Sequence, residues 1–234
     1  MSDTEEEVQR TIKITVVGEP STGKSSLCHR YLGGGGGGGG AGGTAGAEVL
    51  AGQCALRPPA PLQLCDVAGA ALYTLMLDNY LYASDIVMFV YDLTNLKSFE
   101  KLKDWYDRVK EIFDNEDKKP LMALFGNKSD LEHQRAVRLS CVQKFSSEYL
   151  LESFKGSART GEMVDNAFTS LVARVLGRSI RPSAIANGKI PTAQDESQST
   201  PSPTRKESKN ALIMNRKALR KIQRSASSSV CCVQ

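Results

Sequence analysis

The chain has 234 residues, 41% of them apolar, and a formal net charge of +4 at pH 7. This size and composition are sufficient for one domain with a packed core and an additional tail. The longest apolar run, residues 86–91, is far shorter than the roughly 20 residues that span a bilayer, so no transmembrane helix is expected. The acidic N-terminus, MSDTEEE, lacks the apolar core of a secretory signal peptide.

Charge and cysteine content narrow the possible partners and compartments. Residues 1–177 carry 19 Lys and Arg against 23 Asp and Glu, whereas residues 178–234 carry 11 against 3. A basic tail on a mildly acidic body indicates that the tail alone meets an anionic partner, and no nucleic-acid partner is expected. The first four of the six cysteines form no C-x-x-C pair, so we expect no zinc site, no disulfide framework and a reducing compartment.

Apolar runs and helical periodicity alternate along the first three quarters of the chain. Strands are predicted at residues 11–18, 62–66 and 85–93, and strands that continue into loops at 121–131 and 152–158. Residues 25–32 are predicted to form the start of one helix, and further helices are predicted at 98–113, 141–150 and 162–176. In the helix at 98–113 the apolar spacing selects either Trp105 or Tyr106 for the core. The alternation predicts an α/β fold with a mostly parallel sheet covered by helices on both faces.

The segment GEPSTGKS, residues 18–25, fits the pattern G-x-x-x-x-G-K-S between a predicted strand and a predicted helix. That context is the one a phosphate-binding loop requires. Backbone N–H groups and the helix dipole would hold the β-phosphate. Lys24 would place its charge on the β- and γ-phosphate oxygens, and Ser25 would offer a hydroxyl to Mg²⁺.

Two further motifs favour guanine over adenine. Asn127, Lys128 and Asp130 follow a predicted strand in GNKSDL. The Asp130 carboxylate could accept hydrogen bonds from guanine N1–H and the exocyclic amine, and adenine offers no matching donor pair, so that carboxylate would be left unpaired. In SART, residues 157–160, the Ala158 N–H could meet the guanine O6.

A weaker motif, DVAG, occupies residues 66–69 at the end of a predicted strand. Asp66 suits a water-mediated contact to Mg²⁺, and the Gly69 N–H could reach a γ-phosphate. From the motifs, the expected metal ligands are Ser25 and Asp66. The expected nucleotide-binding residues are Gly18, Glu19, Pro20, Ser21, Thr22, Gly23, Lys24, Ser25, Ser26, Gly69, Asn127, Lys128, Asp130, Ser157, Ala158 and Arg159.

Together these motifs resemble those of a Ras-superfamily small GTPase of the Rab type. The segments MLDNYLYASDIVMFVYDLTNLKSFEKLKDWY and GNKSDLEH are most similar to the divergent Rab subgroup numbered twenty-eight. The resemblance covers roughly residues 11–177, and it implies a P-loop GTPase fold with a six-stranded sheet and five helices. It also implies a monomeric switch between GTP and GDP in membrane traffic, with Mg²⁺, exchange factors, activating proteins and effectors.

The first switch departs from the family because a run of eight glycines, residues 33–40, falls within it. The resemblance assigns the Mg²⁺-binding threonine of this switch to Thr44. The aromatic residue that normally covers the guanine has no counterpart, and effector-contacting side chains are missing. We expect the glycine run to be disordered without nucleotide and loosely held with GTP, because glycine has the largest ordering entropy to overcome.

Three more departures lie near the expected γ-phosphate. Ala70 stands where the family usually has the glutamine that orients the attacking water, so no catalytic residue is assigned. Pro20 lacks an N–H, and its ring would crowd the γ-phosphate side and obstruct an arginine finger. Cys65 replaces a usual tryptophan, and local repacking is expected there.

Residues 1–10 are interpreted as an acidic extension, 11–177 as the GTPase domain and 178–234 as a disordered tail. The chain ends CCVQ, which predicts lipidation of Cys231, and a terminal glutamine favours farnesyl over geranylgeranyl. A second lipid on Cys232 is an alternative. With the basic tail as a second signal, this predicts peripheral attachment to the cytoplasmic face of intracellular membranes or the plasma membrane.

Two functional interpretations stay open from the sequence. One is a switch that hydrolyses GTP slowly. The other is a GTP-binding scaffold with negligible turnover, because Ala70 and the glycine-rich switch remove groups that catalysis needs. An ATP-binding P-loop kinase is disfavoured by the Asn127–Asp130 motif.

Overall fold

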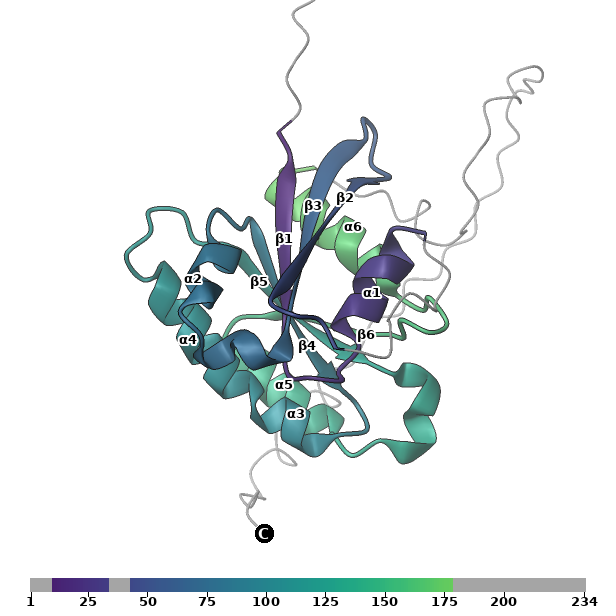
Figure 1. The fold of residues 1–234 in the computed structure, drawn as a ribbon. Coiled ribbons are helices and arrows are strands. Elements are labelled where there is room, and N and C mark those ends of the chain that lie inside the picture. The colour runs from purple at the N-terminus through teal and green to yellow at the C-terminus, as the bar shows by residue number, and fades with distance from the viewer. Residues whose placement is uncertain (1–9, 34–42, 179–234) are drawn as a thin grey trace, which may run out of the picture. The chain divides into compact units, whose positions relative to one another are not determined.

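The structure is a computed structural model that describes residues 10–33 and 43–178. A six-stranded sheet has the order β2-β3-β1-β4-β5-β6 (Figure 1). Its strands are β1 (Ile12–Val17), β2 (Ala47–Cys54), β3 (Ala60–Val67), β4 (Ile86–Asp92), β5 (Leu121–Asn127) and β6 (Glu152–Lys155). Only the β2–β3 pair is antiparallel, so the expected mostly parallel α/β sheet is confirmed.

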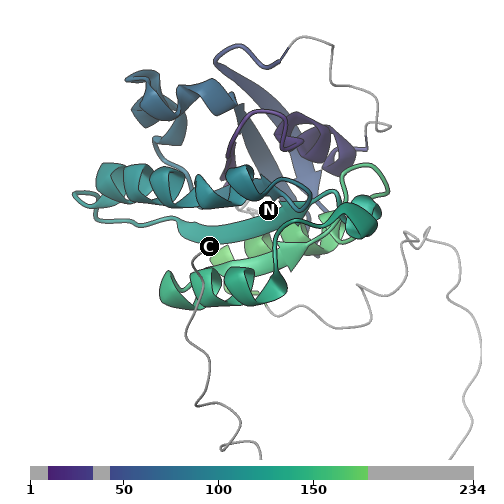
Figure 2. The same ribbon diagram turned by 90° about the horizontal axis from the view of Figure 1, so that it is seen from below.

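Helices cover both faces of this sheet, as predicted. They are α1 (Lys24–Tyr31), α2 (Met76–Leu81), α3 (Leu96–Glu100), α4 (Leu102–Phe113), α5 (Leu139–Glu148) and α6 (Val164–Val175). The core side chains of α1 and α6 form one buried cluster, and those of α2 to α5 form another. In Figure 2, α1 (purple) lies on the opposite side from α2 (blue) and α4 (teal).

The apolar spacing of the helix predicted at 98–113 correctly identifies its buried face. Leu102, Trp105, Val109 and Phe113 are buried at intervals of three and four residues, the period of one helical face. Trp105 is the member of its pair in the core, with 0% exposure, while Tyr106 is half-buried. The helix is observed as α3 and α4, separated by Lys101, so the described residues contain six α-helices rather than the expected five.

Besides two short 3-10 helices, Gly69–Tyr73 and Ser129–Gln134, one strand and one α-helix were missed by the sequence prediction. β2 has the sequence AEVLAGQC, in which alanine and glycine are poor strand formers and half of the residues are exposed. It is an edge strand that pairs with β3 along its whole length. The other missed element, α2, has six residues, too few for helical periodicity to be clear.

Several expectations concern residues outside the described ranges. They are the acidic extension over 1–9, the glycines over 34–40 and the tail over 179–234, which includes Cys231 and Cys232. Within the described residues, no helix has both the length and the apolar character needed to cross a membrane.

The parallel pairing places the carboxyl ends of five strands at one edge of the sheet. β1, β3, β4, β5 and β6 all run in the same direction, downward in Figure 1. Ligands of open α/β sheets bind at this edge, in the loops that follow the strands. The predicted motifs at residues 18–25, 66–69, 127–130 and 157–160 all begin there.

Candidate functional site

The loop between β1 and α1 has a backbone path that its glycines make possible. Gly18 has φ +141°, and an added Cβ would lie 2.2 Å from the Val90 carbonyl oxygen. Gly23 has φ +89°, and a Cβ there would lie 2.4 Å from Asn127 Nδ2. Both positions therefore require glycine. Ser21 also adopts a left-handed conformation, with φ +62°, so this loop holds a strained non-glycine residue.

Lys24 lies over the loop from which it projects. Its Nζ donates to the carbonyl oxygens of Gly18 and Glu19, at 2.9 Å each. Burial lowers the pKa of Lys24, while the carboxylates of Asp66 and Glu19 act in the opposite direction. A buried ammonium above a loop of N–H groups is chemically suited to an anionic phosphate.

Three oxygen-bearing side chains meet where the expected Mg²⁺ would bind. Asp66 Oδ2 accepts hydrogen bonds from Ser25 Oγ at 2.5 Å and Thr44 Oγ1 at 3.1 Å, and the two hydroxyl oxygens lie 2.9 Å apart. The other carboxylate oxygen, Asp66 Oδ1, is buried without a partner. Burial raises the pKa of Asp66, opposed by the Ser25 hydrogen bond and the charge of Lys24. An unpartnered buried carboxylate oxygen beside two hydroxyls fits the hard oxygen donors that Mg²⁺ prefers.

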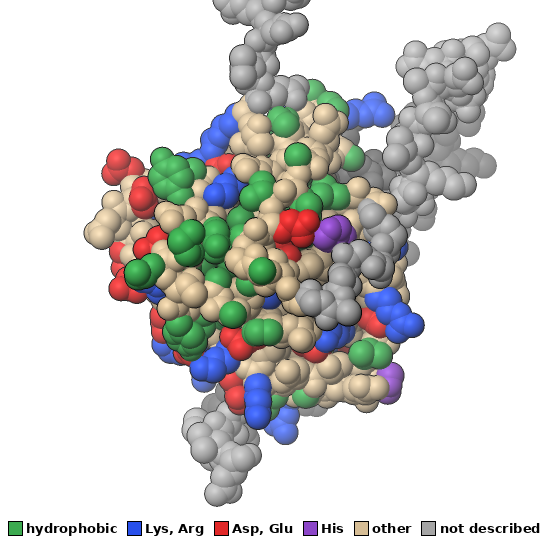
Figure 3. All heavy atoms as spheres, viewed as in Figure 1, with side chains coloured by type: hydrophobic (Ala, Val, Ile, Leu, Met, Phe, Trp, Pro, Cys, Tyr) green, Lys and Arg blue, Asp and Glu red, His purple; other side chains and the backbone are tan. Residues whose placement is uncertain are grey.

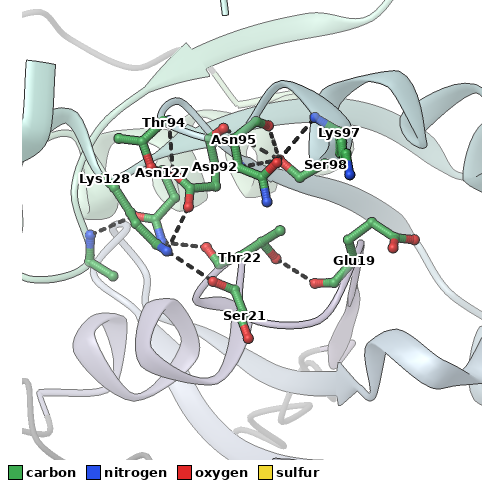
Figure 4. Close-up of polar contacts among 11 residues, drawn as sticks. Glu19, Ser21, Thr22, Asp92, Thr94, Asn95, Lys97, Ser98, Asn127 and Lys128 are labelled. Atoms are coloured by element: carbon green, nitrogen blue, oxygen red, sulfur yellow. Dashed lines mark hydrogen bonds and ion pairs between the residues drawn. The ribbon is translucent and has the colours of Figure 1, made fainter. Parts of the chain in front are cut away.

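The side chain of Asn127 joins the first loop to the last (Figure 4). Its Nδ2 donates to the Thr22 carbonyl oxygen at 2.8 Å, and its Oδ1 accepts from the Ala158 N–H at 2.9 Å. Asn127 ends β5 and is 2% exposed, so both hydrogen bonds are buried. One amide therefore fixes the spacing between the phosphate loop and the 157–160 loop.

Asp130 is held by residues of the same last loop. Ser157 Oγ donates to Asp130 Oδ1 at 2.6 Å, and Arg159 Nη1 lies 3.5 Å from Oδ2. The Arg159 side chain is 80% exposed, whereas that of Asp130 is 14% exposed. One carboxylate oxygen of Asp130 is thus held by a hydrogen bond, and the other lies near the guanidinium of the exposed Arg159 side chain.

Lys128 connects the phosphate loop to the end of β4. Its Nζ donates to the Ser21 carbonyl oxygen at 3.0 Å and to Asp92 Oδ2 at 2.6 Å (Figure 4). Thr94 donates to the other oxygen of Asp92 through both its N–H and its hydroxyl. Burial alone would raise the pKa of Asp92, but the hydrogen bonds from Lys128 and Thr94 outweigh it and lower the pKa.

Asp92 is a residue that the sequence interpretation missed. Its position gave a signal, because an acidic residue at the carboxyl end of a buried parallel strand lies on the ligand-binding edge. It falls within the strand predicted at 85–93 and was given no role in the site.

The residues expected near the γ-phosphate also cluster. An added Cβ at Gly69 would lie 2.3 Å from Pro20 N and 2.5 Å from Pro20 Cδ, so the two loops are in direct contact. Ala70 and Pro20 are exposed. Cys65 is 2% exposed in the cluster beneath α2 to α5, and burial raises the pKa of its thiol.

Ser26 is half-buried in the first turn of α1 and lies next to Ser25 in the sequence. The structure therefore brings together the expected residues of all four loops. The positions of Cys231 and Cys232 lie outside the described ranges.

Exposed apolar side chains follow the Gly69 segment. Tyr73, Leu75 and Met76 are 79%, 87% and 50% exposed. Figure 3 shows hydrophobic side chains gathered on this face of the molecule. A contiguous exposed apolar surface is typical of a protein-binding site.

Comparisons with known proteins identify the family. The sequence model of the Ras family matches residues 13–177. Rab-28 of Caenorhabditis elegans is 33% identical over 169 residues, which cover 71% of this chain and 68% of that protein. Rab-39 of the same organism is 32% identical over 172 residues, with 71% and 73% coverage. Human Rab-26 is 28% identical over 170 residues, with 72% and 65% coverage.

These matches confirm the resemblance inferred from the motifs. The chain therefore belongs to the Ras family of small GTPases, as a divergent member of the Rab type that is similar to Rab-28.

Proposed function

We propose that this protein is a GTP- and GDP-binding switch in membrane traffic that hydrolyses GTP slowly. Ras and Rab proteins as a class are GTPases that bind guanine nucleotides with Mg²⁺. The observation that carries the proposal is the pair of buried hydrogen bonds by which Asn127 joins Thr22 to Ala158. That bridge holds the phosphate loop at a fixed separation from the 157–160 loop, whose Ala158 N–H would meet guanine O6.

The residues of the phosphate loop have distinct proposed roles. Backbone N–H groups between Gly18 and Ser26, apart from Pro20, which has none, would surround the phosphates, and the Lys24 ammonium would move from its carbonyl partners to neutralise the β- and γ-phosphate oxygens. Ser25 and Thr44 hydroxyls would ligate Mg²⁺ and Asp66 would hold one of its waters. When bound, the ion neutralises phosphate charge during transfer to water.

Guanine selection is proposed to depend on the carboxylate of Asp130. Ser157 Oγ holds Asp130 Oδ1, and the carboxylate would accept hydrogen bonds from the N1–H and exocyclic amine of guanine. Adenine offers no matching donors, so the carboxylate would be left unpaired. The free-energy cost of that unpaired group would discriminate strongly against adenine. Lys128 and Arg159 would flank the base from either side, and the Ala158 N–H would meet O6.

Slow hydrolysis is proposed because of Ala70. An alanine methyl cannot orient a water molecule, and the remaining acceleration would come from Lys24 and from the Gly69 N–H at the γ-phosphate. The exposed Pro20 would obstruct a finger supplied by an activating protein. The competing candidate, a scaffold with negligible turnover, is favoured by the same Ala70.

The proposal divides the chain into an acidic extension (1–10), a GTPase domain (11–177) and a basic tail (178–234). The tail would attach the protein to the cytoplasmic face of membranes through a farnesyl or geranylgeranyl group on Cys231, with Cys232 as a second site. Lys and Arg near an anionic surface contribute on the order of 1 kcal/mol each. Exposed Tyr73 and Leu75 support a surface for exchange factors, activating proteins and effectors.

Single-turnover hydrolysis with the purified full chain separates the two candidates. We expect a measurable rate above that of GTP in Mg²⁺ buffer, and a higher rate for Ala70→Gln. A rate equal to that of free GTP in both proteins would overturn the enzymatic proposal and favour the scaffold.

A further inference from the structure

The phosphate loop is hydrogen-bonded to helix α4 through a side chain with no phosphate-binding chemistry of its own. Glu19, the second residue of the loop, accepts a hydrogen bond from Trp105 Nε1 at 3.1 Å. Trp105 is the single tryptophan of the sequence and has 0% exposure. The two residues are 86 positions apart in the chain, so this contact belongs to the tertiary fold.

A buried indole N–H needs an acceptor, since leaving it unpaired costs free energy. The acceptor here is the carboxylate of Glu19. Its negative charge opposes the binding of an anion, which is the proposed role of this loop. In Figure 4 the Glu19 carboxylate extends away from Lys128, Ser21 and Thr22. The side chain is therefore directed toward α4 and away from the base-side residues of the loop.

The main chain of Glu19 supports two groups of the loop. Its carbonyl oxygen accepts from Lys24 Nζ and from Thr22 Oγ1, at 2.9 Å each. On the other side, an added Cβ at Gly69 would lie 2.7 Å from Glu19 C. The following residue, Pro20, has no N–H with which to hold the peptide.

We propose that Glu19 is a positioning residue. Its hydrogen bond to Trp105 fixes the main chain of Glu19, whose carbonyl oxygen accepts from Lys24 and whose carbonyl carbon lies close to Gly69. The bond thereby ties the phosphate site to α4. Because the Gly69 segment would move when a γ-phosphate arrives, the environment of the Trp105 indole should differ between the GDP and GTP states. This inference rests on the proposed guanine-nucleotide binding.

Dissociation of fluorescent mant-GDP from the Mg²⁺-loaded full chain tests the positioning role. Glu19→Leu removes the acceptor at similar size, and we expect dissociation to accelerate about five- to tenfold, the loss of one buried hydrogen bond. Glu19→Gln keeps an oxygen acceptor and should stay within about twofold of the natural chain. Glu148→Leu, at an exposed site on α5, is the matched control and should leave the rate unchanged.

Trp105→Phe keeps an aromatic ring but removes the donor, so it provides a second test if Glu19→Leu fails to fold. It should reproduce the acceleration of Glu19→Leu, and the double variant should be no faster than either single variant. Tryptophan emission should differ between GDP and a non-hydrolysable GTP analogue in the natural chain and in Glu19→Gln. That difference should be lost in Glu19→Leu.

Three results would overturn the inference. Equal effects of Glu19→Gln and Glu19→Leu would mean that the charge of Glu19, and not its hydrogen bond, matters. Lower melting temperatures with unchanged dissociation would mean a structural role alone. Additive effects in the double variant would mean that the two residues act separately. Failure of the natural chain to bind mant-GDP is a distinct result, because it would refute the proposed function itself.

Discussion

The contact between Gly69 and the phosphate loop leads to a prediction about Gly69→Ala. The new Cβ would lie 2.3 Å from Pro20 N, 2.5 Å from Pro20 Cδ and 2.7 Å from Glu19 C. These atoms belong to the backbone or to a proline ring, so no flexible side chain can move aside. Overpacking of this kind typically costs about 1–3 kcal/mol.

We expect Gly69→Ala to lower the free energy of unfolding by that amount, measured by urea denaturation at one fixed GDP and Mg²⁺ concentration. For a domain of this size the melting temperature should fall by roughly 2–4 °C per kcal/mol. Dissociation of mant-GDP should also accelerate, because the displaced peptide carries a partner of Lys24.

Gly43→Ala is the matched control. A Cβ at Gly43 meets nothing within 4 Å. The substitution should therefore change stability by no more than about 0.5–1 kcal/mol, in the stabilising direction. If Gly69→Ala and Gly43→Ala have the same stability and the same dissociation rate, the close approach of the two loops is wrong.

Further predictions concern the same edge of the sheet. Asn127→Ala loses both buried hydrogen bonds and should lower the free energy of unfolding by about 2–4 kcal/mol in urea titrations; a loss below 1 kcal/mol would contradict the bridging role. Asp92→Asn weakens the pair with Lys128. Because the folded-state pKa of Asp92 is lowered, its stabilisation is present above the unfolded value of about 3.9 and is lost as pH falls through the folded value, so the two stability–pH curves should converge below about pH 4. Parallel curves down to acid unfolding would refute this. Ser21→Gly removes a left-handed serine and should raise the free energy of unfolding by about 1 kcal/mol, with a slightly higher melting temperature. The control Ser26→Gly, within α1, should lower the free energy of unfolding by a similar amount.

The sequence predicted the parts of the fold whose signal is local. β1, the phosphate loop and β5 with its Asn127 motif are contiguous stretches whose spacing carries their chemistry. The buried face of α4 followed from periodicity in the same way. Parallel pairing then placed the loops at one edge, since the carboxyl ends of parallel strands coincide.

What the sequence did not predict depends on contacts between distant residues. β2 exists because β3 offers an edge for it to pair with, and its own alanines and glycine give little strand signal. The pairing of Asp92 with Lys128 and of Glu19 with Trp105 needs the loop geometry before either partner can be chosen. In each contact a loop residue meets a residue of a helix or strand that is close to it only in the folded chain.

The central claim is that the edge of the sheet binds a guanine nucleotide. Mass spectrometry of the small molecules released from the full chain, purified with Mg²⁺ and then denatured, tests it most directly. The account predicts GDP or GTP at close to one molecule per chain and no adenine nucleotide. An adenine nucleotide in that position, or no nucleotide combined with failure to take up added GDP, would contradict it.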